Sequence, residues 1–480
     1  MIFNSFEFIF LFLPIVFIGY FALNKVNFTL SKVWLFLSSL FFYGWWNPIY
    51  LPLLLFSLIV NYIIGTTLGK MKQPMKKKAL LTIGILFNVG LLGYFKYYDF
   101  FITNVNAVFD TDYRVMNLIL PLAISFYTFQ KIPYLVDSYQ GETKGYHPLN
   151  YGLFVSFFPQ LIAGPIVQHG DVMAQFENKE NRKINAKNIA TGLFVFGIGL
   201  FKKVGIADTF AEIANAGYSN PATLTMVDSW ITSLSYTFQL YFDFSGYSDM
   251  AIGAALLFNI RLPINFNSPY KALSIQDFWR RWHMTLSNFL TRYIYVPLGG
   301  NRKGLVRTYI NIMIVFFVSG VWHGAGWTFI IWGLMHGIAS VINRLWGQAG
   351  FKLPKLLAWF ITFQFVNAAW VFFRAPSVHD AIMVLRSMIG LNGRVLPTDL
   401  QHTFFNQLNI PYYDFTLDEN FFWVVGILLV AFLISVFAKN SMYFKDHLKP
   451  NWISAIYISA LIIYSVFQLQ QVSEFLYFNF

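Results

Sequence analysis

Long runs of apolar residues, separated by short polar segments, repeat along the whole chain. An α-helix needs about 18–20 predominantly apolar residues to cross the hydrocarbon core of a bilayer. The pattern therefore predicts an all-α, polytopic integral membrane protein with about eleven to thirteen membrane helices or re-entrant elements. The predicted spans cover residues 8–24, 33–46, 49–68, 79–98, 116–135, 189–206, 227–243, 308–324, 327–345, 356–374, 421–438 and 452–469.

Two apolar segments differ from simple spans. Residues 150–166 contain Pro159, Gly164 and Pro165, which favours a re-entrant element buried in protein. The segment 246–260 is short, and we expect a helix break at Gly246. No internal repeat or low-complexity linker divides the chain, so residues 1–480 are predicted to form a single polytopic domain.

Composition and charge agree with a membrane protein. Only 12% of the residues are charged and 56% are hydrophobic, whereas soluble domains carry about 25% charged residues. The net charge is +12, but the cations lie between apolar runs, which excludes a nucleic-acid binder. Loops 70–78, 178–188 and 298–307 are rich in Lys and Arg, so we expect them on the cytoplasmic side, with loop 376–420 outside. The chain has no Cys, which excludes thiolate metal sites.

Residues 276–296 are predicted to form a basic amphipathic helix instead of a span. Arg281 and Arg292 fall on its polar side, and His283 falls at the edge of its apolar stripe, pointing towards the protein. We expect this helix at the membrane interface, in contact with lipid. Its predicted apolar face consists of Trp279, Trp282, Leu286, Phe289, Leu290 and Tyr293.

Two histidines lie inside predicted membrane segments, where an ionisable side chain is costly and therefore points to function. His323 ends an apolar run that begins near Thr308, so about fifteen helical residues carry it about 22 Å from the basic loop. It is either a core histidine that binds a backbone carbonyl or a general base. His336, in the following run, has the same two interpretations. The remaining histidines are expected on the surface: His147, His169, His379, His402 and His447.

Asp243 and Asp249 lie in an aromatic, apolar run. They either bind backbone amides or an Arg, or they line a polar cavity. No HExxH spacing or acidic ligand accompanies the histidines, so no metal site is predicted. The sequence also lacks the GxSxG, P-loop and dinucleotide-binding patterns, which leaves a covalent serine mechanism without support.

Several ordered motifs resemble the membrane-bound O-acyltransferase (MBOAT) family. The first is RRWHMTLS at 280–287, followed about forty residues later by VWHG at 321–324. Further blocks resemble the bacterial branch that contains the membrane subunits of alginate and peptidoglycan O-acetyltransferases. These blocks lie at 125–130, 158–165, 242–249, 261–270 and 474–480.

The resemblance implies an enzyme that takes acetyl from a cytoplasmic thioester, acetyl-CoA, and passes it across a bacterial inner membrane. The recipient would be an exported polysaccharide, reached through an extracytoplasmic SGNH-type acetyltransferase or another polysaccharide-modification protein. The family's catalytic histidine corresponds to His323, and its second position to His283. We expect no cofactor besides the acetyl-CoA substrate, and either direct transfer or an acetyl-His323 intermediate. The expected substrate-binding residues are Trp279, Arg280, Arg281, Trp322, His336, Asp243 and Asn267.

Other functions stay open at this point. A polytopic transporter or flippase for an acylated glycan would account for the spans and the buried Asp243 and Asp249, but not for the RRWH and WHG motifs. A non-catalytic scaffold for a glycan-modifying complex would leave both histidines dispensable. Within the family, D-alanyl transfer to teichoic acid from a carrier protein is the nearest different chemistry.

Overall fold

The computed structural model describes residues 1–143, 145–162, 164–393, 395–401, 410–415, 417, 420–449, 451–469 and 476. His402 and the terminal block at 474–480, apart from Leu476, lie outside the described residues. The described chain is mostly helical and has almost no strand, as the apolar runs predict. The α-helices are α1 Leu13–Val26, α2 Phe28–Gly44, α3 Leu51–Lys70, α4 Pro74–Leu92, α5 Tyr98–Phe109, α6 Ile124–Gln140, α7 Pro148–Ser156, α8 Phe158–Leu161, α9 His169–Glu177, α10 Ala186–Phe201, α11 Asp208–Ser219, α12 Met226–Leu257, α13 Ile275–Trp279, α14 Met284–Leu290, α15 Leu305–His323, α16 Trp327–Gln348, α17 Lys355–Arg374, α18 Val378–Met388, α19 Phe421–Phe437, α20 Ser441–His447 and α21 Trp452–Gln468.

Short π-helical and 3₁₀ turns extend or join these helices. The π-helical turns are η1 Glu7–Phe12, η3 Gly93–Tyr97, η5 Lys202–Ala207 and η8 Thr291–Tyr295. The 3₁₀ turns are η2 Pro48–Tyr50, η4 Lys179–Arg182, η6 Pro221–Thr223, η7 Pro269–Lys271 and η9 Thr398–Leu400. Two strands of two residues each, β1 Leu396–Pro397 and β2 Tyr412–Tyr413, pair in parallel with Leu396 opposite Tyr412.

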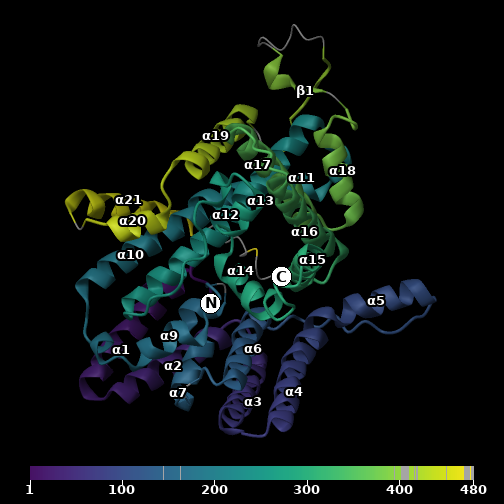
Figure 1. Ribbon diagram of the computed structural model, residues 1–480. Helices are drawn as coiled ribbons and strands as arrows, with labels where there is room; N and C mark the ends of the chain where they lie inside the picture. The colour runs from purple at the N-terminus through teal and green to yellow at the C-terminus, as the bar shows by residue number, and fades with distance from the viewer. Residues whose placement is uncertain are drawn as a thin grey trace.

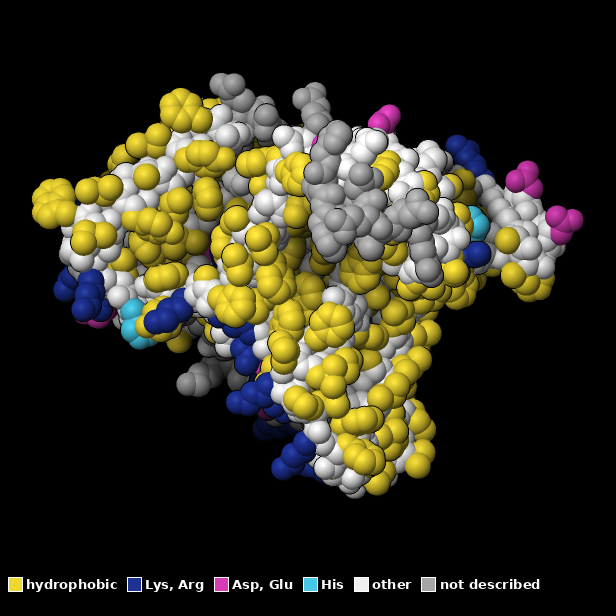
Figure 2. All heavy atoms as spheres, turned by 90° about the horizontal axis from the view of Figure 1, so that it is seen from above, with side chains coloured by type: hydrophobic (Ala, Val, Ile, Leu, Met, Phe, Trp, Pro, Cys, Tyr) yellow, Lys and Arg dark blue, Asp and Glu magenta, His cyan; other side chains and the backbone are white. Residues whose placement is uncertain are grey.

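The all-α, polytopic membrane architecture is confirmed, but the described chain has fewer candidate spans than the eleven to thirteen elements predicted, because several apolar helices are too short to cross a bilayer. Seven helical segments of the described chain are long and apolar enough to cross a bilayer, or eight if the bent pair α19 and α20 is one span. Figure 1 shows α12, α13 and α14 in the middle of the molecule, with α1–α4 and α6 below, α15–α18 above and to the right, and α19 above. Figure 2 shows a face covered largely by hydrophobic side chains, with many of its Lys and Arg side chains along the lower-left edge. Which edge faces the cytoplasm stays a prediction.

The predicted span at 116–135 is wrong. The chain is not helical from 111 to 123, and α6 begins only at Ile124. Ala123 has a left-handed backbone (φ 58°), which does not continue a right-handed helix on its N-terminal side. The residues that follow are buried in protein along most of α6, including the side chains of Lys131 and Asp137.

The predicted break at Gly246 is also wrong, because α12 runs unbroken for 32 residues. Gly246 packs directly against α10: a Cβ atom there would lie 2.7 Å from the carbonyl oxygen of Gly199. Small residues let two membrane helices approach closely. The glycine therefore serves the contact between α10 and α12 and leaves the helix intact.

Residues 148–166 match the expected broken, buried element. The nine-residue α7 and the four-residue α8 are separated at Phe157, and their side chains are almost wholly buried from Asn150 to Leu161. Neither helix is long enough to cross a bilayer. Phe158 packs against Phe12 and Phe42, so this element fills the space between α2 and α12.

Candidate active site

His323 is the last residue of α15 and is buried in an aromatic enclosure. Its ring lies 4.7 Å from the ring of Trp322, 4.9 Å from Trp332 and 5.1 Å from Phe373, measured between centroids. Trp332 in turn stacks on Trp370 of α17 at 5.7 Å. The enclosure therefore brings together side chains from α15, α16 and α17 around one imidazole.

Glycines allow the hairpin of α15 and α16 to form around His323. A Cβ atom at Gly320 would lie 2.5 Å from the carbonyl oxygen of Phe329, and one at Gly324 would collide with the Phe329 ring. The backbone of Gly324 is extended (φ −161°, ψ 152°), so the helix ends directly after His323. The WHG motif thus turns the chain while the imidazole stays inside.

The predicted continuous helix at 276–296 is wrong, because the chain breaks at His283. His283 has a left-handed backbone (φ 42°, ψ 54°), and it separates α13 from α14. Asn265 replaces the missing helical bonds: its carbonyl oxygen accepts from the Met284 amide at 3.0 Å, and its side chain accepts from the Thr285 amide at 3.3 Å. The expected lipid contact is also wrong: of the predicted apolar face, all but the half-buried Tyr293 are buried inside the protein, namely Trp279, Trp282, Leu286, Phe289 and Leu290.

The break turns the His283 ring towards His323. The two ring centroids lie 6.5 Å apart, and the ring of Trp322 lies 6.0 Å from that of His283. Phe244 of α12 packs against the other side of His283 at 4.9 Å. The structure therefore brings the two predicted catalytic histidines together at the centre of the fold, although they are forty positions apart in the sequence.

Hydrogen-bond partners define the tautomers of two histidines. Asn265 Oδ1 accepts from the Thr285 amide and hydroxyl, so it is an acceptor, and His283 Nδ1 at 3.1 Å must carry the hydrogen. Conversely, Trp279 Nε1 can only donate, so His336 Nδ1 at 3.2 Å accepts and its hydrogen sits on Nε2. Neutral His283 therefore offers a lone pair at Nε2, and neutral His336 offers a donor.

A cavity of about 530 Å³ lies beside this cluster. Trp279 lines it, lies 5.8 Å from the Trp332 ring and bonds to His336. Two guanidinium groups, Arg280 and Arg344, are among the lining residues. The rest of the wall is Gln276, Ser287, Leu290, Thr291, Tyr295, Ile312, Val315, Phe316 and Ser340. The cavity thus combines two guanidinium groups with an aromatic wall that lies one side chain from the His323 enclosure.

Three predicted substrate-binding residues lie elsewhere. Arg281 is held by an ion pair with Asp277 at 2.8 Å and does not line the cavity. Asn267 is exposed, and its side chain accepts from Asn440. Asp243 is buried in an ion pair with Lys203 at 2.8 Å and accepts from the Leu476 amide at 3.3 Å.

Asp249 pairs with Lys202 at 2.7 Å. Asp243 and Asp249 of α12 therefore pair with lysines of the η5 turn, a buried-charge pairing that sequence alone left open. Sequence analysis missed Asn265, Trp332 and Arg344, which lie in apolar runs or beside more conspicuous motif residues. Of these, only Asn265 falls within a block that had been singled out, the one at 261–270.

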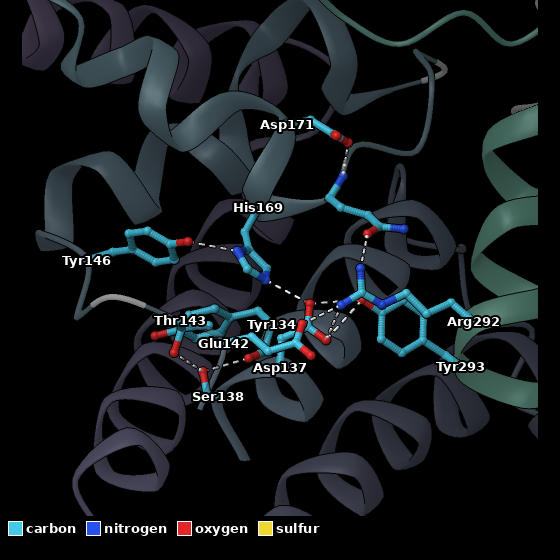
Figure 3. A network of polar contacts seen from close by, with 11 residues as sticks. Tyr134, Asp137, Ser138, Glu142, Thr143, Tyr146, His169, Asp171, Arg292 and Tyr293 are labelled. Carbon is cyan, nitrogen blue, oxygen red and sulfur yellow. Dashed lines mark hydrogen bonds and ion pairs between the residues drawn. The ribbon is translucent and has the colours of Figure 1, made fainter. Parts of the chain in front are cut away.

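The expectation that His169 lies on the surface is wrong. Figure 3 shows His169 between Tyr146 and Asp137: Nδ1 lies 2.8 Å from the Tyr146 hydroxyl, and Nε2 lies 2.8 Å from Asp137 Oδ2. Burial, followed by the charge of Asp137, raises the pKa of Tyr146 above its ordinary value, so its hydroxyl is protonated and donates. Arg292 and Tyr293 bind the same carboxylate, at 3.3 Å and 2.9 Å.

This network joins α6, α9 and η8, and the π-helical turn η8 also supplies Thr291 and Tyr295 to the cavity wall. Its contacts fully account for the burial of His169. His147, His379 and His447 are exposed, as expected. Within the described residues, no group of His, Asp and Glu side chains is arranged to hold a metal ion.

Residues 138–376 match the MBOAT, membrane-bound O-acyltransferase family. A peptidoglycan O-acetyltransferase of Helicobacter pylori is 47% identical over 100% of this chain and 98% of its own length. The chain belongs to the MBOAT family. A probable alginate O-acetylase AlgI of Pseudomonas aeruginosa is 39% identical over 81% of this chain and 75% of its own length. A teichoic acid D-alanyltransferase of Bacillus subtilis is 29% identical over 55% of this chain and 71% of its own length.

This MBOAT protein is thus an O-acyltransferase and a multi-pass protein of the bacterial inner membrane. The family match spans the segment that contains both histidines and the lining of the cavity. The resemblance drawn from the RRWH and WHG motifs is confirmed.

Proposed function

We propose that this enzyme transfers an acetyl group from acetyl-CoA on the cytoplasmic side to a hydroxyl group on the outer side, for the O-acetylation of an exported polysaccharide. The observation that carries the proposal is the position of His323. It is buried beside His283, one aromatic side chain from a cavity with two guanidinium groups. Relatives at 47% and 39% identity are named as peptidoglycan and alginate O-acetylating proteins.

The cavity has the chemistry that a CoA thioester requires. Arg280 and Arg344 suit its phosphates, because a guanidinium group binds phosphate oxygens in a bidentate manner. The wall formed by Trp279 and Phe316 suits the less polar pantetheine arm and leads towards His323 through Trp332. This cavity adjoins the predicted cytoplasmic loop 298–307, which begins three residues after Tyr295.

The size of the enclosure supports a short acyl group. Trp322, Trp332, Trp370 and Phe373 are all buried, and the rings of three of them approach the His323 ring to about 5 Å. Closely packed indole rings leave no path for a long alkyl chain beside the imidazole. Acetyl, with two carbons, is the acyl group that this arrangement fits best.

The proposed reaction is an acyl transfer with His323 as general base. His323 takes the proton of the acceptor hydroxyl, the oxygen attacks the thioester carbonyl, and CoA leaves as a thiolate; the proton held by His323 then passes to this thiolate, which restores the neutral base. His283, with its lone pair at Nε2, cannot donate to the oxyanion while neutral, so it serves as an acceptor that orients the acceptor hydroxyl or His323. Trp332 Nε1 and His336 Nε2, which have no partner within the described residues, are the donors we assign to the oxyanion and the donor thioester.

The acceptor side is proposed from the relatives' names and from chemistry. A hydroxyl of an exported polysaccharide, or a carrier group on an extracytoplasmic SGNH-type acetyltransferase, would approach His323 from the side opposite the cavity. The relatives' names leave two polysaccharides, peptidoglycan and alginate. Removing water from the enclosure favours transfer to such an acceptor over hydrolysis.

Purified protein in proteoliposomes tests the proposal. With acetyl-CoA labelled in the acetyl group, the wild type should transfer label to a polysaccharide fragment or an SGNH partner, or release it slowly to water. His323→Ala should lose at least about 10²-fold, because a general base contributes about 10²–10⁴-fold. His379→Ala, an exposed histidine of α18, is the matched control and should behave as wild type.

Three other results would contradict the proposal. Activity of His323→Ala near the wild-type rate would favour a non-catalytic scaffold. Uptake of an acylated glycan without chemical change would indicate a transporter or flippase. Label transfer from a D-alanyl carrier-protein thioester, with none from acetyl-CoA, would indicate D-alanyl transfer, the activity for which the teichoic-acid relatives are named.

A further inference from the structure

The turn that carries His323 is bound by a lysine from a distant helix. The π-helical turn η3, Gly93–Tyr97, lies at the bend between α4 and α5, beside the end of α15 (Figure 1). Lys96 Nζ lies 2.5 Å from the carbonyl oxygen of Trp322 and 3.2 Å from that of His323. The next residue, Tyr97, donates its hydroxyl hydrogen to the carbonyl oxygen of Val321 at 2.7 Å. Two consecutive side chains therefore bind three consecutive carbonyls.

These carbonyls need partners because α15 ends abruptly. The last four carbonyl groups of an α-helix have no intrahelical donor, and leaving a buried one unpaired costs about 1–3 kcal/mol. A glycine in the left-handed conformation commonly supplies the missing donors, but Gly324 is extended and only its own amide bonds back, to Gly320 at 3.4 Å. Lys96 and Tyr97 supply the donors instead. A cation at this end also interacts favourably with the helix dipole.

The remaining contacts of Lys96 are with a hydroxyl group and an aromatic ring. Its Nζ lies 3.4 Å from the hydroxyl of Ser125 on α6 and 6.0 Å from the centre of the Trp322 ring. Among the described residues it forms no ion pair with a carboxylate. A lysine inside a membrane bundle is expensive unless its ammonium group is satisfied. Here the backbone of the WH motif satisfies it.

We propose that Lys96 is a positioning residue for acyl transfer, which holds the backbone of Trp322 and His323 so that the imidazole faces His283 and Trp332. This inference rests on the proposed function. Lys96 binds the backbone carbonyl oxygen of His323. It therefore acts on the position of the residue that carries the base, and we assign it no part in proton transfer. Because α15 ends at His323, the carbonyl groups of Trp322 and His323 accept no hydrogen bond from a following helical turn. Lys96 therefore holds this part of the backbone in its place.

The test compares Lys96→Met, which keeps the length of the side chain, with Lys96→Arg, which keeps the charge and the donors. A misplacement of about 1 Å costs about 10²-fold in rate. We therefore expect Lys96→Met to lower kcat for acetyl transfer by about 10–100-fold, with KM for acetyl-CoA within about twofold of wild type. Lys96→Arg should recover most of kcat. Lys76→Met, an exposed lysine on α4, is the matched control and should have no effect.

A second variant covers the case in which Lys96→Met does not fold. Tyr97→Phe removes only the bond to the Val321 carbonyl, so it should lower kcat by a few-fold at unchanged KM. Thermal unfolding in detergent is measured for every variant, because a purely structural lysine would lower stability and leave the kcat of the surviving protein intact.

Three results would overturn the inference: wild-type kcat in Lys96→Met and in Tyr97→Phe, an increase in KM alone, or an equal loss in Lys96→Met and Lys96→Arg. His323→Ala separates this inference from the proposed function. If His323→Ala stays active, the proposed function fails and this inference fails with it. If His323→Ala is inactive while Lys96→Met is as active as wild type, only the role of Lys96 is refuted.

Discussion

Asn265 offers the sharpest test of how the second histidine is held. It is buried, and its side-chain oxygen accepts three hydrogen bonds, from His283 Nδ1 and from the amide and hydroxyl of Thr285. Asn265→Leu keeps a similar size and removes all three. Asn267→Leu, two positions away in the same motif, removes only an exposed contact with Asn440.

The expected magnitude follows from these bonds. A typical intramolecular hydrogen bond contributes about 1 kcal/mol, and a buried group left unpaired costs more. Losing three of them should lower the free energy of unfolding by about 3 kcal/mol. The His283 ring also loses the partner that fixes its tautomer. At metal sites, removing the partner that orients a ligating imidazole costs about 10–100-fold, and we expect acetyl transfer to fall by a similar factor here.

The assay combines two measurements on the same purified samples. Tryptophan fluorescence during unfolding in detergent gives the change in stability, and transfer of labelled acetyl in proteoliposomes gives the rate. For Asn267→Leu, the free energy of unfolding should stay within about 0.5 kcal/mol of wild type, as is usual for a surface substitution, and the transfer rate within about twofold. The reasoning is refuted if both variants behave alike, or if Asn265→Leu loses stability while its rate per folded molecule is unchanged.

Three further predictions follow from the enclosure, the cavity and the network. Trp332→Leu should raise the preference for butyryl-CoA over acetyl-CoA about tenfold in kcat/KM, because two buried methylenes are worth about 1.6 kcal/mol; an unchanged ratio of donors would contradict the enclosure. Arg280→Ala should raise KM for acetyl-CoA more than it lowers kcat, whereas Arg281→Ala, paired with Asp277, should change neither in a steady-state assay. His169→Ala should lower the free energy of unfolding by about 1.5–3 kcal/mol, because a hydrogen bond to a buried carboxylate is lost; chemical unfolding in detergent measures it, and a neutral result would refute the network's role.

Apolar runs predicted most of the helices because a bilayer imposes a minimum apolar length on every span. The same criterion failed where protein, and not lipid, surrounds a helix. In α12, buried polar side chains and Gly246 resemble a break in the sequence, yet the helix is continuous and Gly246 packs against α10. At 116–135 the apolar residues belong partly to an irregular segment, and the left-handed Ala123 delays the helix.

His323 was accessible from sequence because an imidazole in an apolar run is conspicuous, and His283 was accessible through the resemblance of the RRWH motif to the MBOAT family. Their partners were not. Asn265 and Asn267 lie in the same motif, and the motif does not show that Asn265 is buried against His283 while Asn267 is exposed. Lys96 comes from a helix more than 220 positions before His323, a contact that no local pattern encodes. His169 was misplaced because its carboxylate partner lies on another helix.

Acetylation of the exported polysaccharide in living cells tests the central claim most directly. A strain that lacks this protein is complemented with wild type, His323→Ala or His379→Ala at equal membrane levels, and ester-linked acetate on the polysaccharide is measured. The account predicts wild-type acetate with His379→Ala and none above background with His323→Ala. A folded His323→Ala protein that restores a tenth or more of the acetate would contradict His323 as the general base.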